Sequence, residues 1–248
     1  MDAARRRLMR ALPAAAAAMA AVLAVAKPAR AATSVAELVL ACDLTPGPAM
    51  RAVGNAYGNT AGVRVNVFPT EPGLILPQLE RSVQNDIVVV RVATLDAAVQ
   101  AGAVAAGAAR GAWSNRLVVA VKRGAPAAQG KPIAVCDPSP ASDIDGPAIL
   151  ARLGLLPTAV QGVIDTDTVV ALLLDGTARA GLLHMTDVRA HPALDVIRVV
   201  PDDIQPPIAY AAAVTNLARR PNPADLVDFL VTGRATALLV AHGLEKSS

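Results

Sequence analysis

The chain has 248 residues with 23 basic and 20 acidic side chains, and only 2% of its residues are aromatic, so that Ala, Val and Leu must build the core. Its first 31 residues hold six of the basic side chains and one of the acids, which leaves the remainder with a net charge of −2. The basic isoelectric point therefore does not indicate nucleic-acid binding. No later segment approaches the roughly 20 apolar residues of a membrane-spanning helix.

Residues 1–31 have the pattern of an export signal. Four arginines between Arg5 and Arg10 precede an apolar run from Ala11 to Ala26, and Ala29-Arg30-Ala31 is a small-x-small cleavage site. Residues 5–10 also resemble a twin-arginine export signal; the alternatives are an ordinary secretory signal and a retained membrane anchor. We predict a periplasmic protein, in an oxidising compartment where Cys42 and Cys136 could form a disulfide.

The rest of the chain alternates strands with helices. Strands are predicted at 37–41, 63–68, 87–90, 116–121, 132–135, 180–184, 196–200 and 208–214. Helices are predicted at 49–59, from the turn at 69–73 to about 84, and at 94–109, 146–153, 168–174, 223–230 and 234–241. The unbroken β-branched run at 87–90 is typical of a parallel strand that is covered on both faces. The alternation predicts an α/β fold with doubly wound sheets.

Two successive sets of β/α units, with the chain returning to the first set at its end, indicate a two-lobed periplasmic-binding-protein fold. Each lobe would contain a mixed sheet, and two hinge strands near 117–121 and 208–214 would join the lobes. The predicted boundaries are 32–116 plus 211–248 for lobe I and 117–210 for lobe II. A ligand would bind in the cleft between them.

The order of motifs resembles the molybdate- and tungstate-binding periplasmic proteins of ABC importers, which are type II solute-binding proteins. The matching segments are 39–45, 62–65, 115–118, 133–138, 153–154, 169–173, 176–183 and 206–210. The resemblance implies a monomer without cofactor that delivers a small ligand to an ABC permease in the inner membrane.

The same resemblance places the ligand residues, and several are substituted. The two serines of the family's first turns correspond here to Asp43 and to Glu71 or Pro72. The later contacts map to Ser142–Asp143, to Thr166–Asp167 and, in place of a tyrosine, to His184. Two unit charges at ~4 Å interact by ~4 kcal/mol at an effective dielectric constant near 20, so an inward carboxylate would oppose an oxyanion. Asp43 could instead cap the helix that starts at Pro46.

Two other functions remain open. In the first, Asp43, Glu71, Asp143, Asp167 and His184 hold a metal or organic cation, with Cys42, Cys136 and His184 as candidate metal ligands. In the second, the fold is a ligand-free interaction scaffold. Arg91 supports this function, because the family usually has a small residue at that position. The cysteines could equally be buried free thiols.

An enzymatic function is not predicted. Ser142, His184 and Asp167 supply the residue types of a nucleophile, a base and an orienting acid. However, no Gly-x-Ser-x-Gly motif marks a catalytic serine, and there is no phosphate-binding loop.

Overall fold

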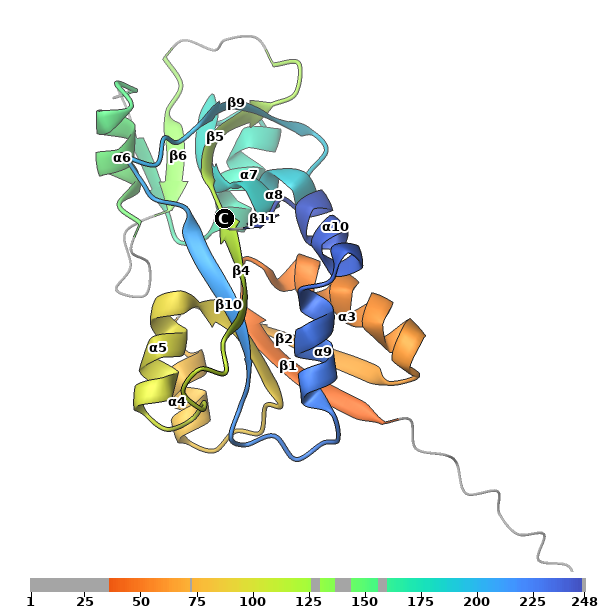
Figure 1. Cartoon of the computed structure of the whole chain (residues 1–248). Coiled ribbons are helices and arrows are strands. Elements are labelled where there is room, and N and C mark those ends of the chain that lie inside the picture. Colours follow the sequence, from red (N-terminus) through yellow and green to blue (C-terminus); the bar gives the residue numbers. More distant parts are fainter. Residues whose placement is uncertain (1–35, 72, 126–129, 137–143, 156–159, 247–248) are drawn as a thin grey trace, which may run out of the picture. The chain divides into compact units, whose positions relative to one another are not determined.

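The computed structural model in Figure 1 describes residues 36–71, 73–125, 130–136, 144–155 and 160–246. The predicted signal segment at 1–31 and the candidate residues Ser142 and Asp143 lie outside this part. Within it, no helix has both the length and the apolar character needed to cross a membrane.

The first lobe is built on a six-stranded mixed sheet with the strand order β11-β4-β10-β3-β1-β2. Strand β1 pairs in parallel with β2 and with β3, whereas β10 is antiparallel to β3 and to β4. The strands are β1 (Glu37–Asp43), β2 (Arg64–Thr70), β3 (Ile87–Arg91), β4 (Arg110–Asn115), β10 (Ile208–Val214) and β11 (Glu245–Lys246).

Helices cover both faces of this sheet. On one face pack α3 (Gly47–Ala61), α9 (Pro223–Leu230) and α10 (Gly233–Ala241), and on the other α4 (Ile75–Glu80) and α5 (Val92–Gln100), as Figure 1 shows. Alternate residues of β3 enter the two cores, with Ile87 and Val89 in the first and Val88 and Val90 in the second. The prediction that 87–90 is a strand covered on both faces is confirmed.

The second lobe contains a five-stranded mixed sheet with the order β7-β6-β8-β5-β9. Its strands are β5 (Leu117–Lys122), β6 (Ile133–Cys136), β7 (Val160–Val163), β8 (Ala180–His184) and β9 (Leu194–Val199). The helix α6 (Gly146–Arg152) packs on one face, and α7 (Thr166–Leu174) and α8 (Met185–Ala190) on the other. The predicted two-lobed α/β fold with a mixed sheet in each lobe is confirmed.

Side chains tie the strands together where the chain passes from the first sheet to the second. Arg116 lies between β4 and β5, and its guanidinium pairs with Glu245 of β11 and with Asp202. Beside it, Asn115 Nδ2 donates to Thr186 Oγ1 at 2.9 Å. The residues at this crossing are therefore held from α8, from β11 and from the returning segment.

Some elements differ from those predicted. The helix predicted at 94–109 ends at Gln100, because Gly102 and Gly107 adopt positive φ angles that no right-handed helix accommodates. The helix predicted at 168–174 begins two residues earlier, because Asp165 caps α7 by accepting from the Thr168 N–H at 2.7 Å. The elements β4, β7, α8 and β11 were not predicted, because each is short and depends on its neighbours.

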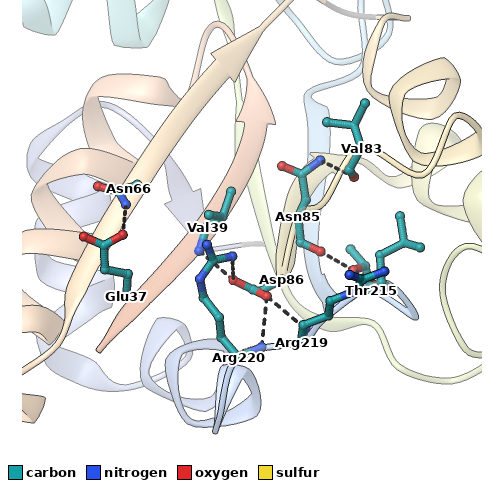
Figure 2. Close-up of polar contacts among 10 residues, drawn as sticks. Glu37, Val39, Asn66, Val83, Asn85, Asp86, Thr215, Arg219 and Arg220 are labelled. Carbon is teal, nitrogen blue, oxygen red and sulfur yellow. Dashed lines mark hydrogen bonds and ion pairs between the residues drawn. The ribbon is translucent and has the colours of Figure 1, made fainter. Parts of the chain in front are cut away.

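A buried carboxylate anchors the amino-terminal ends of β1 and β3 (Figure 2). Asp86 is fully buried, and its Oδ2 accepts from the Val39 N–H at 2.8 Å and from Arg220 Nη1 at 3.2 Å. Its Oδ1 accepts from the N–H groups of Arg219 and Arg220 at 3.2 and 3.4 Å. Asp86 thus joins β1, β3 and the segment after β10 at the end of the sheet opposite to the candidate site.

Candidate functional site

The candidate site lies at the carboxyl ends of β1 and β3. These neighbouring parallel strands end at Asp43 and Arg91, and the chain then continues into α3 and α5. Tyr210 on β10 is the register partner of Arg91, so the two side chains lie on the same face of the sheet. Open α/β folds usually bind ligands at this edge.

Asp43 is buried, and only one of its two carboxylate oxygens has a hydrogen bond from the described residues. The residue is 1% exposed, and its Oδ2 accepts from the Arg91 backbone N–H at 2.9 Å. Its Oδ1 is buried and accepts no hydrogen bond from the described residues. Burial raises the pKa of the Asp43 carboxyl to about 6, against the opposing effects of the Arg91 N–H and the Arg91 charge.

The interpretation of Asp43 as a helix cap is wrong. Pro46 occupies the N-cap position of α3, and no side chain caps that helix. The carboxyl group instead bonds to the end of β3, which a cap of α3 would not reach. Asp43 is therefore directed toward Arg91.

Tyr210 completes a polar group around Asp43. It is 1% exposed, and its hydroxyl is buried without a hydrogen-bond partner of full geometry among the described residues. Burial and then the Asp43 charge raise the pKa of the Tyr210 phenol, whereas the nearby side chains of Arg91 and Thr45 lower it. Asp43, Thr45 and Arg91 thus all lie close enough to Tyr210 to affect its phenol, and we call these four residues the Asp43 cluster.

The start of α3 offers few main-chain donors to an anion. Pro46 and Pro48 have no N–H group, and the Gly47 N–H donates to the Leu44 carbonyl at 3.0 Å. A helix N-terminus normally binds anions through such free N–H groups. At this turn, positive charge comes from the Arg91 side chain.

Neither cysteine forms a disulfide. Cys42 is fully buried, and burial followed by the Asp43 charge raises the pKa of its thiol to about 12. A thiol of this kind is neither nucleophilic nor ready to ligate a metal. Cys136 Sγ lies 4.0 Å from Thr166 Oγ1 in the second lobe. Among the described residues, no group of three or more His, Cys, Asp or Glu side chains could hold a metal.

The other described candidate residues belong to other elements than Asp43. Glu71 is exposed after β2, and Asp167 is exposed in the first turn of α7. His184 ends β8 and caps α8, where its N–H and its Nδ1 contact Asp187 Oδ2 at 2.9 and 3.2 Å. Within the described ranges, no hydrogen bond or ion pair joins Asp43 to Thr166, Asp167 or His184.

The sequence prediction did not name Arg91 or Tyr210 among the candidate site residues. Both carried a signal, since Arg91 is the charged residue that ends a β-branched run and Tyr210 closes the segment at 206–210. A charged side chain at the carboxyl end of a parallel strand is where α/β folds place function.

A cavity of about 320 Å³ lies elsewhere, between α3 and β2. Arg51 and Phe68 are among its lining residues, and none of the buried unpartnered polar atoms lies in its lining. It therefore lacks the enclosed polar groups that distinguish the Asp43 cluster.

The chain is similar to several solved binding proteins. It matches the substrate-binding domain of a molybdenum ABC transporter, described as putative, from Clostridium difficile with a TM-score of 0.71 and 18% identity, covering 86% of this chain and 99% of that one. The molybdate-binding protein of Azotobacter vinelandii matches with a TM-score of 0.67 and 15% identity, over 85% of this chain and 100% of that one. At these identities, the similarity shows the fold.

Another relative is named as an enzyme and not as a binding protein. A Pseudomonas protein named aconitate isomerase is 24% identical over 249 aligned positions, which cover 92% of this chain and 95% of the relative.

The family described as bacterial extracellular solute-binding protein matches residues 38–245. This range begins in β1 and ends in β11, so it includes both sheets and the Asp43 cluster. The chain therefore belongs to the family of bacterial extracellular solute-binding proteins.

Proposed function

We propose that this protein is an exported solute-binding component of an ABC importer, and that it holds a small organic acid between its lobes at the Asp43 cluster. A signal at 1–31 would direct it to the periplasm. The ligand would favour the closed form of a monomer. The lobe boundary predicted at 210 would then lie before Ile208, because the whole of β10 belongs to the sheet of the first lobe. That form would then dock on a permease in the inner membrane.

The observation that carries this proposal is the position of Arg91 beside Asp43 and Tyr210 at the strand ends. A guanidinium presents five N–H donors in a planar fork that matches a carboxylate, and it can serve a ligand together with a protein neighbour. The remaining members of the cluster supply hydroxyl groups and a buried carboxyl. This set of groups suits an acid with further polar atoms.

The cluster suits molybdate or tungstate less well. The two prolines of the first turn remove main-chain donors that would surround an oxyanion. An ionised Asp43 at ~4 Å from a dianion would oppose its binding by roughly 8 kcal/mol at an effective dielectric constant near 20, twice the value for two unit charges. A tetrahedral oxyanion carries its whole charge at that distance, whereas an organic acid can keep its carboxylates farther from Asp43 and turn an uncharged atom toward it. The relative named for aconitate, a tricarboxylate, agrees with an organic acid.

The alternatives have weaker support. A metal or an organic cation would have to bind beside the Arg91 charge. A ligand-free scaffold would leave the buried Asp43 Oδ1 without a donor among the described residues, which costs about 1–3 kcal/mol.

We also propose binding without catalysis. The raised pKa of Tyr210 keeps that phenol protonated, and the Arg91 N–H holds Asp43 through Oδ2, which leaves only Oδ1 as an acceptor for a ligand. The name of the Pseudomonas relative makes a direct test necessary. Purified protein should not interconvert cis- and trans-aconitate, as followed by ultraviolet absorbance, and turnover above the buffer rate would overturn this part of the proposal.

The main test is a thermal-shift screen of the chain from Ala32 to Ser248, followed by calorimetry. The panel contains citrate, malate, succinate and both aconitates, together with molybdate, tungstate, sulfate, divalent metals and choline. We expect organic acids to raise the melting temperature and Arg91→Gln to weaken their binding at least tenfold. The exposed Arg81→Gln at the end of α4 should have no effect. Tight binding of molybdate, or of a metal, would refute the proposal.

A further inference from the structure

Two polar atoms of the Asp43 cluster stand out because they are buried and unpartnered. Asp43 Oδ1 and Tyr210 Oη are both inaccessible to solvent, and neither has a hydrogen-bond partner of full geometry within the described part of the chain, although the Arg91 and Thr45 side chains lie near the phenol. Both residues are 1% exposed, so water does not satisfy them at the surface. Native proteins rarely leave such atoms unpaired without a functional reason.

The chemistry of each atom determines whether its hydrogen-bond partner must be a donor or an acceptor. An ionised carboxylate oxygen only accepts hydrogen bonds, so Asp43 Oδ1 requires a donor. A phenol hydroxyl can both donate and accept, so Tyr210 can share a group that donates to Asp43. A hydroxyl group meets both demands, because it donates one hydrogen bond and accepts others.

We propose that the solute is an organic acid that carries a hydroxyl group, with its carboxylate on Arg91 and its hydroxyl between Asp43 and Tyr210. This inference rests on the proposed function, since it names the ligand class of the same site. Sites built to bind a hydroxyl strongly reject analogues without one, because the buried groups of the protein then remain unpaired.

Access to the cluster requires the protein to open, because both atoms are enclosed in the described structure. Hinged closure around a ligand is the common motion of two-lobed binding proteins.

The test compares acids that differ only by a hydroxyl group. Calorimetry at pH 7.5 would measure L-malate against succinate and citrate against tricarballylate. We expect the wild-type protein to bind each hydroxy acid at least tenfold more tightly than its partner. Tyr210→Phe should weaken the binding of L-malate about tenfold while leaving succinate within twofold.

Asp43→Asn gives the sharpest contrast. If the amide oxygen keeps the hydrogen bond from the Arg91 N–H, the amide NH₂ takes the place of Oδ1 and presents a donor where the wild type presents an acceptor. The preference for L-malate over succinate should then fall below threefold or reverse. The matched control is Asp96→Asn, an exposed residue of α5, which should keep the wild-type preference.

The outcomes separate the two proposals. Equal wild-type affinity for both members of each pair overturns the hydroxyl inference and leaves the organic-acid function standing. No binding of any organic acid overturns the proposed function and this inference with it. If Asp43→Asn does not fold, the wild-type pairs and Tyr210→Phe still decide, because a preference that Tyr210→Phe leaves unchanged contradicts the inference.

Discussion

Replacing Asp86 should destabilise the first lobe more than any change at its partners. Asp86 is fully buried and receives four hydrogen bonds, one of them from the Arg220 guanidinium. Asp86→Ala leaves the Val39 N–H and the two arginine N–H groups without this acceptor. Breaking a buried pair of this kind costs about 3–5 kcal/mol, and we expect a loss in that range.

Two further variants separate the contribution of the N–H hydrogen bonds to Asp86 from that of its ion pair with Arg220. Asp86→Asn keeps the size of the side chain, but its NH₂ must face N–H donors in either orientation, so we expect a loss of about 2–4 kcal/mol. Arg220→Ala removes the ion pair alone. Because the Arg220 side chain is 31% exposed and three N–H bonds to Asp86 remain, its loss should be about 1 kcal/mol.

Urea unfolding measures these differences. The transition can be followed by far-ultraviolet circular dichroism and by the fluorescence of Trp113, the single tryptophan, which is 2% exposed in the first lobe. Asp96→Ala on the surface of α5 serves as the control and should lie within about 0.5 kcal/mol of the wild type. The reasoning is refuted if Asp86→Ala costs no more than Arg220→Ala.

Three other predictions concern pH, packing and thiol chemistry. Because burial raises the pKa of Asp43 from 3.8 to about 6, the folded protein should lose about 2 kcal/mol of stability relative to Asp43→Asn between pH 4.5 and pH 8, as measured by urea unfolding. Gly58→Ala should destabilise by about 1–3 kcal/mol despite the better helix propensity of alanine, because the new Cβ would lie 2.6 Å from the Val63 carbonyl oxygen; an unchanged or higher melting temperature would contradict this. Cys42 should resist maleimide at pH 8 in the native state and react after denaturation, as seen by mass spectrometry; rapid native labelling would show that the thiol is accessible.

The general architecture was predictable because apolar periodicity reports burial directly. The run at 87–90 is β-branched at every position, and β3 is indeed buried on both faces. By contrast, β4 reads Arg-Gly-Ala-Trp-Ser-Asn, a sequence without apolar alternation, and it is held by pairing with β10 and β11. Strands that depend on distant partners leave little local signal.

The candidate site was predicted only in part, for a similar reason. Position 43 follows from the resemblance and from the strand-to-helix turn. The direction of its carboxyl does not, because the donor that it meets is the N–H of Arg91, 48 residues later in the sequence. Tyr210 enters the cluster through the antiparallel pairing of β10 with β3, a long-range register that local patterns do not encode.

The two prolines at the start of α3 affect how readily the specificity of this protein can change. A binding site made of main-chain N–H groups is nearly the same whatever side chains surround it, so point substitutions alter it little. Here Pro46 and Pro48 remove such groups from the first turn, and the charge lies on the Arg91 side chain. A single nucleotide change can replace a side chain, so the ligand preference of the site that we propose would be open to rapid divergence and to redesign at one or two positions.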